Sequence, residues 1–297
     1  QDYLADTPIK LNVSVDEPTT RAGYSSTELP EGFLLAVYHI LEDQTVDKKY
    51  SYEVWAKKVG DSWKTYKFNK ETNSVTDEEV TMLWANMKDK VSVAAFTNLG
   101  DITIPTAQTS DDQLKQADVL YMPTADCYPK LCKDGINVNL QHAMSKINLT
   151  IELGSEYEFS KEDVDLKIKD VKIDGSLVSA TVYANGIYDE FGVPTPIFPF
   201  HTGTTPYSKT GGVITKASAT YEAILIPQYI ESGKFTVSFK VDGKLYEWAY
   251  NQELTLAPNT AYTLKLIAGN DKVQPVSFSV AEWKPGNGEN GEKKETD

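Results

Sequence analysis

Short runs in which apolar and polar residues alternate recur along the whole chain, and no other feature restricts the fold as much. Residues 147–153, near the midpoint, are a clear example, because every second residue is apolar. A period of two buries one face of a strand and exposes the other to water. About seven similar runs lie before the midpoint and about seven follow it, separated by turn signals. We therefore expect an all-β protein built from sandwiches.

The length of 297 residues favours two such domains in tandem. We interpret residues 147–153 as the last core strand of a first domain that spans residues 1–154. The second domain is expected to span residues 155–284. Residues 285–297 are polar and rich in Gly, so we expect a flexible tail.

Turn signals predict how neighbouring strands are joined. Gly60-Asp61 is expected to join two strands in which aromatic and polar residues alternate. Asp174-Gly175 and Asp242-Gly243 are strong two-residue hairpin signals, because both central positions of a type I′ turn need a positive φ. Each of the three is therefore expected to connect paired antiparallel strands.

Helix is expected only as short turns. Thr76, followed three residues later by Glu79, forms a capping-box pattern and predicts a short helix through Met82 and Trp84. The segment that begins at Ser110 predicts a second helical turn.

Composition and motifs exclude several functions. The net charge of −14 argues against nucleic acid as a partner, since binding phosphates requires a basic surface. No hydrolase, phosphate-binding or metalloprotease motif occurs, and the 43 carboxylates make chance pairs inevitable. We expect no enzymatic activity, no cofactor and no metal; a hydrolase on a β-sandwich stays a remote alternative. The expected role of His142 is structural, hydrogen-bonded at a domain edge.

Two cysteines, Cys127 and Cys132, are separated by four residues. A lone pair lacks the four ligands of a structural zinc site and does not match a redox C-x-x-C motif. If the protein is exported, a local disulfide that closes this loop is the better interpretation. Such a short loop would stabilise the fold by about 2 kcal/mol.

Arg21 is the only arginine among 29 basic residues. It follows an alternating run at residues 9–16 and lies in a polar segment that contains Pro18, which we expect to be an exposed linker. One explanation for the single arginine is a composition bias towards lysine. The other is a surface kept free of sites for an arginine-specific protease, except at this linker.

Three motifs in order resemble the fimbrillin superfamily, the subunits of type V pili and related surface lipoproteins of Bacteroidia. They are Thr20-Arg21-Ala22 after the first strand, the midpoint sequence His142-Ala143-Met144-Ser145-Lys146-Ile147, and the closing strand that ends Ala281-Glu282-Trp283-Lys284-Pro285-Gly286. The resemblance covers nearly the whole chain.

The resemblance implies two transthyretin-like β-sandwiches, exported as a lipoprotein to the outer membrane through a lipidated cysteine before Gln1. It further implies cleavage between Arg21 and Ala22 by an arginine-specific protease. Residues 1–21 would then be the removable piece, with Ile9, Leu11, Val13 and Val15 as the apolar side chains of the released strand.

A strand of the next subunit would fill the vacated groove by donor-strand exchange and produce a pilus at the cell surface. Within this chain the candidate donor strand carries Val276, Phe278 and Val280. The partners implied are other pilus subunits and the protease. The alternative is a monomeric cell-surface lipoprotein that binds carbohydrate or a host surface protein, with strand aromatic residues such as Trp55 stacking on sugar rings.

Overall fold

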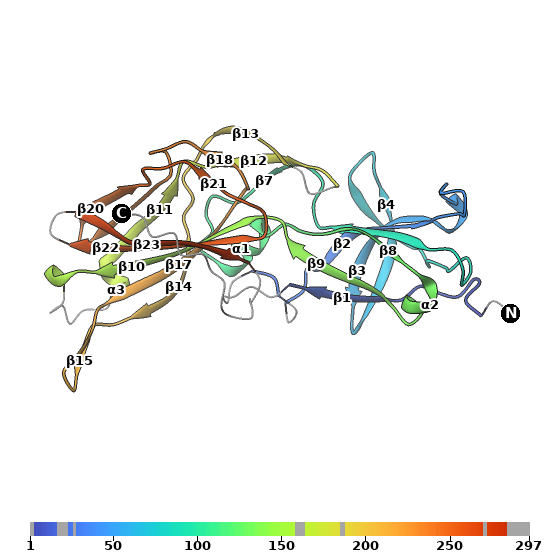
Figure 1. Ribbon diagram of the computed structural model, residues 1–297, viewed down its shortest axis with the longest axis horizontal. Helices are drawn as coiled ribbons and strands as arrows, with labels where there is room; N and C mark the ends of the chain where they lie inside the picture. The colour runs from blue at the N-terminus through green and yellow to red at the C-terminus, as the bar shows by residue number, and fades with distance from the viewer. Residues whose placement is uncertain are drawn as a thin grey trace.

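An eight-stranded sheet forms one end of the computed structural model, which describes residues 3–16, 23–25, 28–157, 164–184, 188–269 and 272–283. The strand order in this sheet is β1-β9-β8-β6-β2-β3-β4-β5, and the strands lie at the right of Figure 1. Its strands are β1 (Leu11–Val15), β2 (Gly32–His39), β3 (Tyr52–Val59), β4 (Ser62–Asn69), β5 (Ser74–Glu79), β6 (Val91–Phe96), β8 (Leu120–Cys127) and β9 (Ile136–His142).

The N-terminal segment connects the two edges of this sheet. Residues 6–9 precede β1 at one edge and pair with residues 82–84, which follow β5 at the other. The backbone N–H of Ile9 donates to the carbonyl of Met82 at 2.8 Å, and the N–H of Trp84 donates to the carbonyl of Thr7 at 2.9 Å. The sheet thereby closes around one hydrophobic core, to which Phe33, Trp84 and Val138 contribute.

The other end of the molecule contains the remaining sheets (Figure 1). A five-stranded sheet has the order β14 (Phe200–Thr205), β17 (Ser218–Leu225), β10 (Ser145–Leu153), β22 (Thr260–Gly269) and β23 (Lys272–Glu282). Two three-stranded sheets contain β11 (Ile168–Asp174), β19 (Thr236–Val241) and β20 (Lys244–Ala249), and β13 (Tyr188–Pro194), β12 (Leu177–Val182) and β7 (Gly100–Thr103). Two-stranded sheets pair β15 (Ser208–Thr210) with β16 (Val213–Thr215), and β18 (Tyr229–Ile230) with β21 (Leu254–Thr255).

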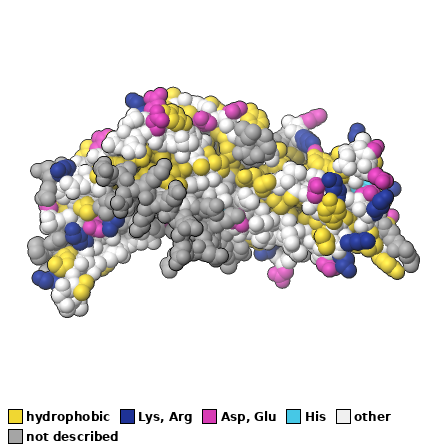
Figure 2. Space-filling model, in the orientation of Figure 1, with side chains coloured by type: hydrophobic (Ala, Val, Ile, Leu, Met, Phe, Trp, Pro, Cys, Tyr) yellow, Lys and Arg dark blue, Asp and Glu magenta, His cyan; other side chains and the backbone are white. Residues whose placement is uncertain are grey.

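The helical elements are short, and the described part of the chain is mainly β, as the sequence predicts. They are η1 (Lys48–Tyr50), α1 (Asp111–Ala117), α2 (Pro129–Cys132), η2 (Ser155–Tyr157) and α3 (Val164–Lys167). On the face shown in Figure 2, acidic and basic side chains are interspersed. This mixture, together with a net charge of −14, favours solubility.

The midpoint strand belongs to the second core, so our assignment of residues 147–153 to the first domain was wrong. β10 pairs antiparallel with β17 and parallel with β22, and lies at the centre of the five-stranded sheet. Alternation shows that a strand has one buried face, but it does not show which sheet the strand joins. Segments before it, β7 and α1, also contact strands of the second part. The number and limits of the domains stay a prediction.

The two predicted helices have opposite outcomes. Residues 74–79 form strand β5, and the hydroxyl of Thr76 donates to the carbonyl of Lys67 at 2.8 Å across the pair. The helix predicted there was wrong. Val75 is the only apolar residue in this segment, so a helix would have no apolar face to bury, and the β-branched Val75 and Thr76 favour a strand. Ser110 does begin a helix, α1, with a complete capping box that includes Gln113. Leu114 and Ala117 bury one face of it.

The hairpin signals are confirmed at two of three places. Gly60-Asp61 joins β3 to β4, and Asp242-Gly243 joins β19 to β20 with φ values of 49° and 81°. Asp174-Gly175 does not form a hairpin, because β11 pairs with β19 whereas β12 pairs with β13 and β7. Gly175, with φ of 105°, turns the chain from one sheet into another.

Candidate functional site

The segment predicted to be removable is an edge strand of the eight-stranded sheet. β1 pairs with β9 alone in that sheet, in parallel, with Leu11 opposite Ile136 and Val15 opposite Leu140. Hydrogen bonds extend the contact at both ends: Ile136 N–H donates to the carbonyl of Lys10 at 2.8 Å, and Asp16 N–H donates to the carbonyl of Leu140 at 2.9 Å. Withdrawing β1 would therefore leave the outer edge of β9 unpaired.

The apolar side chains of this segment all contact the core of the eight-stranded sheet. Val15 is 2% exposed and belongs to the core. Ile9, Leu11 and Val13 are half-buried against it. Ile9 lies before β1 rather than within it, beside residues 82–84. Full burial of one such side chain contributes about 1.5–3 kcal/mol, so together they hold the segment in place.

The predicted cleavage site, Arg21-Ala22, lies outside the described residues, but the chain on both sides of it is described. His142 Nε2 lies 2.9 Å from the carbonyl oxygen of Asp16, before the site. After the site, the backbone N–H of Tyr24 donates to Asp118 Oδ2 at 2.9 Å. His142 Nδ1 and Asp118 Oδ1 lie 2.7 Å apart, and both side chains are fully buried. A single buried pair thus anchors both flanks of the linker.

Both ring nitrogens of His142 lie within hydrogen-bonding distance of an oxygen atom. One oxygen belongs to the carboxylate of Asp118 and the other to the backbone carbonyl of Asp16. The imidazole thus bridges a buried carboxylate and the backbone that precedes the linker.

Trp283 extends this anchor to the C-terminal strand. Its ring is fully buried and stacks on His142, with centroids 4.1 Å apart and planes 7° apart. The ammonium of Lys146 lies 5.4 Å from the Trp283 ring centroid and 3.0 Å from a carboxylate oxygen of Glu222. Burial lowers the pKa of Lys146, although Glu222 opposes that shift. His142 and Trp283, from two separate sequence motifs, are thus in contact.

The candidate donor strand is paired within its own molecule. β23 is an edge strand antiparallel to β22. Phe278 is buried, with its ring centroid 4.9 Å from that of Tyr250, and Val280 is half-buried. The side chain of Val276 lies outside the described residues. Donation of β23 to another molecule would require Phe278 and Trp283 to leave their sites.

Cys127 and Cys132 are joined by a disulfide with an S–S distance of 2.00 Å. It links the end of β8 to α2, immediately before β9. The bond therefore closes the turn that leads into the strand on which β1 is held.

No group of three or more His, Cys, Asp or Glu side chains among the described residues is placed to hold a metal ion. None of the helices in the described ranges is long and apolar enough to cross a membrane.

Comparison with known proteins places the chain in a family. The model of the fimbrillin-like family matches residues 20–283. The chain belongs to that family. No curated protein is detectably similar to it in sequence.

Two solved structures share the fold of this fimbrillin-like chain. One is a candidate cell adhesion protein of Bacteroides ovatus, with 15% identity, a TM-score of 0.63, and coverage of 94% of this chain and 98% of the other. A second, from Bacteroides uniformis, has 15% identity, a TM-score of 0.55, and coverage of 93% and 98%.

Sequence reasoning found part of this site. It predicts a strand where β1 lies, a structural role for His142, and motifs that contain His142 and Trp283. The removal of that strand stays a prediction. Sequence reasoning missed Asp118, Asp16 and Tyr24, because their roles depend on long-range contacts. Gly23 is the one local signal: its φ of 97° and its closeness to Asp118 leave little room for a side chain.

Proposed function

We propose that this chain is a structural fimbrial subunit that accepts a strand from another subunit after residues 1–21 are removed. An arginine-specific protease cuts between Arg21 and Ala22, and the partner strand then takes the place of β1. The observation that carries this proposal is the position of residues 4–16, which close the eight-stranded sheet from its edge.

Loss of this segment would create a site suited to a strand. The outer edge of β9 would present unpaired backbone groups, as would residues 82–84. The apolar side chains of β9, such as Val138, would lose part of their cover. An exposed edge beside an apolar groove recruits another strand by β-augmentation.

The anchor at His142 and Asp118 explains why cleavage would have to precede strand exchange. Before cleavage, Asp16 and Tyr24 are bound to the same buried pair, so the linker between them is tied at both ends. After cleavage, the first strand still has its ladder to β9 but is no longer continuous with the rest of the chain. An incoming strand can then displace it gradually, by competing for β9.

The contacts of β23 favour an acceptor role over a donor role. Its donation would expose Phe278 and break the stack of Trp283 on His142. We therefore assign the donor strand to another subunit rather than to Val276, Phe278 and Val280 of this one. An acceptor that donates no strand of its own occupies the end of a filament, which continues through the subunit that supplies the strand.

The test combines cleavage with capture of a strand. The purified chain is treated with an arginine-specific protease, and its mass and oligomeric state are followed by mass spectrometry and size-exclusion chromatography. We expect one cut after Arg21, followed by binding of an added partner subunit, with neither in Arg21→Ala. Resistance of the native chain to the protease, or a cut that leaves no strand-accepting site, would contradict the proposal.

A surface adhesin is the second proposed role, supported by the two structural neighbours described as candidate cell adhesion proteins. In both roles we place the chain at the cell surface, attached to the outer membrane by a lipid anchor before cleavage. Metabolic labelling with a fatty acid in the native host tests the anchor. Binding of a glycan or host protein by the uncleaved monomer distinguishes the adhesin from a purely structural subunit.

A further inference from the structure

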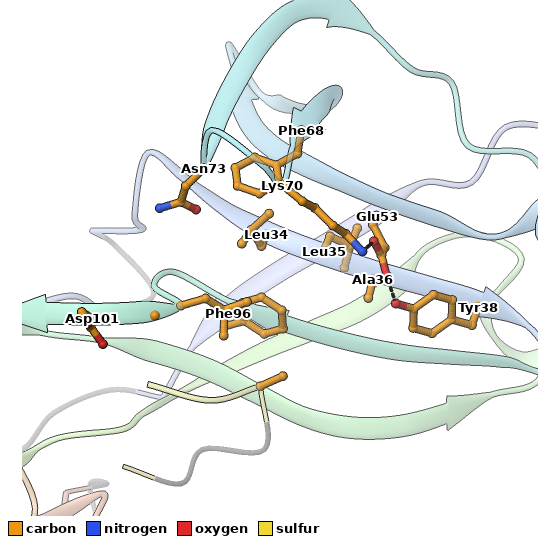
Figure 3. A pocket seen from close by; sticks show the side chains of 13 residues that line it. Leu34, Leu35, Ala36, Tyr38, Glu53, Phe68, Lys70, Asn73, Phe96 and Asp101 are labelled. Atoms are coloured by element: carbon orange, nitrogen blue, oxygen red, sulfur yellow. Dashed lines mark hydrogen bonds and ion pairs between the residues drawn. The ribbon is translucent and has the colours of Figure 1, made fainter. Parts of the chain in front are cut away.

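A cleft of about 590 Å³ lies on the outer face of the eight-stranded sheet. Its floor is Leu34 and Ala36 of β2, and Figure 3 shows Phe68 of β4 and Phe96 of β6 on opposite sides of that floor. Leu99, Gly100 and Asp101 line it from the segment that enters β7. The cleft therefore lies where the two ends of the molecule meet, which is a common position for ligand sites.

Most of the apolar residues that line this cleft lie outside the core cluster of the eight-stranded sheet, although Leu35 belongs to both. In β2 the alternate residues Phe33, Leu35 and Val37 belong to the core, whereas Leu34 and Ala36, each 8% exposed, line the cleft or its floor. Leu34 is paired with Trp55 on one neighbouring strand and with Phe96 on the other. The Trp55 ring stacks near Phe68, with centroids 6.4 Å apart. The outer face of an antiparallel sheet commonly faces water and is polar. Here Trp55, Phe68 and Phe96 give that face an aromatic surface instead.

Polar groups stand at both ends of the cleft, as Figure 3 shows. At one end Glu53 accepts a hydrogen bond from the Tyr38 hydroxyl and forms an ion pair with Lys70. At the other end lie Asn73 and Asp101. Asp101 Oδ1 is held by the Thr181 hydroxyl at 2.6 Å. The rim therefore offers oriented acceptors and donors around an apolar centre.

We propose that this cleft binds a neutral saccharide ring. A pyranose has an apolar C–H face, which suits the partial negative charge on the faces of Phe68 and Phe96. Its edge carries hydroxyl groups, which can both donate and accept, and the rim supplies partners of both kinds. This chemistry fits the cleft better than a wholly apolar ligand, which would displace water from the rim groups without replacing the hydrogen bonds that this water makes.

Charge selects among saccharides. Lys70 is paired with Glu53, so Asp101 leaves the rim with a net negative charge. The whole chain also carries a net charge of −14. An anionic sugar would be repelled, so neutral glycans are favoured. This inference rests on the adhesin role above and does not depend on cleavage at Arg21.

The test is a glycan array probed with the uncleaved chain, followed by titration calorimetry with the neutral glycan retained. Phe68→Ala and Phe96→Ala are each expected to weaken binding by roughly tenfold or more, because each removes one wall of the cleft. Phe191→Ala, an exposed phenylalanine on β13, is the matched control and should bind normally. Asn73→Gly, at an exposed turn with a φ of 50°, should weaken binding with the unfolding midpoint little changed, because glycine keeps the positive φ. This variant separates binding from folding.

Three results would overturn the inference: no neutral glycan retained by the array, binding that survives in both Phe variants and in Asn73→Gly, or a preference for sialylated glycans. Arg21→Ala should bind the glycan as the unaltered chain does. Failure of strand exchange with intact glycan binding would therefore contradict the filament proposal alone, and the reverse result would contradict this one alone.

Discussion

His142 and Trp283 lie face to face, with ring centroids 4.1 Å apart and planes inclined by 7°. His142 is the last residue of β9, and Trp283 follows β23, the last described strand of the chain. The same imidazole contacts the carbonyl of Asp16, just before the cleavage linker. The N-terminal segment and the C-terminal strand are therefore fixed at one point in the interior.

Trp283→Ala should be strongly destabilising, since it removes a fully buried ring from between two ends of the molecule. We expect a loss of about 3–5 kcal/mol in the free energy of unfolding, measured by urea denaturation. Leu245→Ala, at an exposed position on β20, is the control and should change stability little. A loss below about 1 kcal/mol for Trp283→Ala would show that the stack does not contribute as described.

Asp118→Ala should loosen the linker. It leaves the Tyr24 N–H and His142 Nδ1 without their partner, at a cost of about 1–3 kcal/mol. Because cleavage of a folded chain requires local opening, the rate of cutting after Arg21 should rise, as followed by mass spectrometry. Glu247→Ala, at an exposed position on β20, should be cut at the original rate. An unchanged rate in Asp118→Ala would mean that the pair does not restrain the linker.

Tyr221→Phe should make the protein more resistant to alkali. Burial, with a smaller effect of Asp165, raises the pKa of Tyr221 to about 12. The unfolded chain releases this proton near pH 10, so the stabilisation is present below pH 10 and is lost between about pH 10 and 12, with a magnitude on the order of 2 kcal/mol.

The measurement is the free energy of unfolding of the variant and the unaltered chain at several pH values in that window. The difference between the two isolates Tyr221 from Lys146, whose lowered pKa acts with the opposite sign. Tyr3→Phe, at an exposed position, is the control. Parallel pH profiles for Tyr221→Phe and the unaltered chain would contradict the prediction.

Gly175→Ala and Gly243→Ala should differ sharply although both follow an aspartate. Both glycines have a positive φ, and an added Cβ at Gly243 would meet nothing within 4 Å, so we expect a loss of about 1 kcal/mol there. At Gly175 the Cβ would lie 2.1 Å from the carbonyl oxygen of Lys234, so the loss should be about 3 kcal/mol or more. Thermal unfolding of the two variants side by side is the measurement, and equal losses would contradict it.

These two glycines also show how much of the fold can be predicted from the sequence. Local patterns identified most strands, because alternation and Asp-Gly turns depend on neighbouring residues. They did not identify partners: Asp174-Gly175 turns the chain between two sheets, whereas Asp242-Gly243 closes a hairpin. β10 was assigned to the wrong core for the same reason. Which strands meet depends on contacts between residues far apart in the chain.

The candidate site likewise has features that the sequence predicts and features that depend on long-range contacts. The edge strand with Val15 follows from alternation, and the linker follows from Pro18 and Arg21. The closure of the sheet by residues 6–9 against residues 82–84 could not be predicted. The two segments are far apart in the chain, and no local pattern shows that they pair. The anchoring role of Asp118 depends on the helix cap of α1 meeting the end of β9.

The direction of β1 has a consequence for any strand that replaces it. β1 runs parallel to β9, an arrangement slightly less stable per residue than its antiparallel counterpart. A substitute entering from the opposite end would convert the five-residue ladder with β9 into the more stable form. The native strand would then be the weaker of two competing occupants, and the change of polarity would favour exchange.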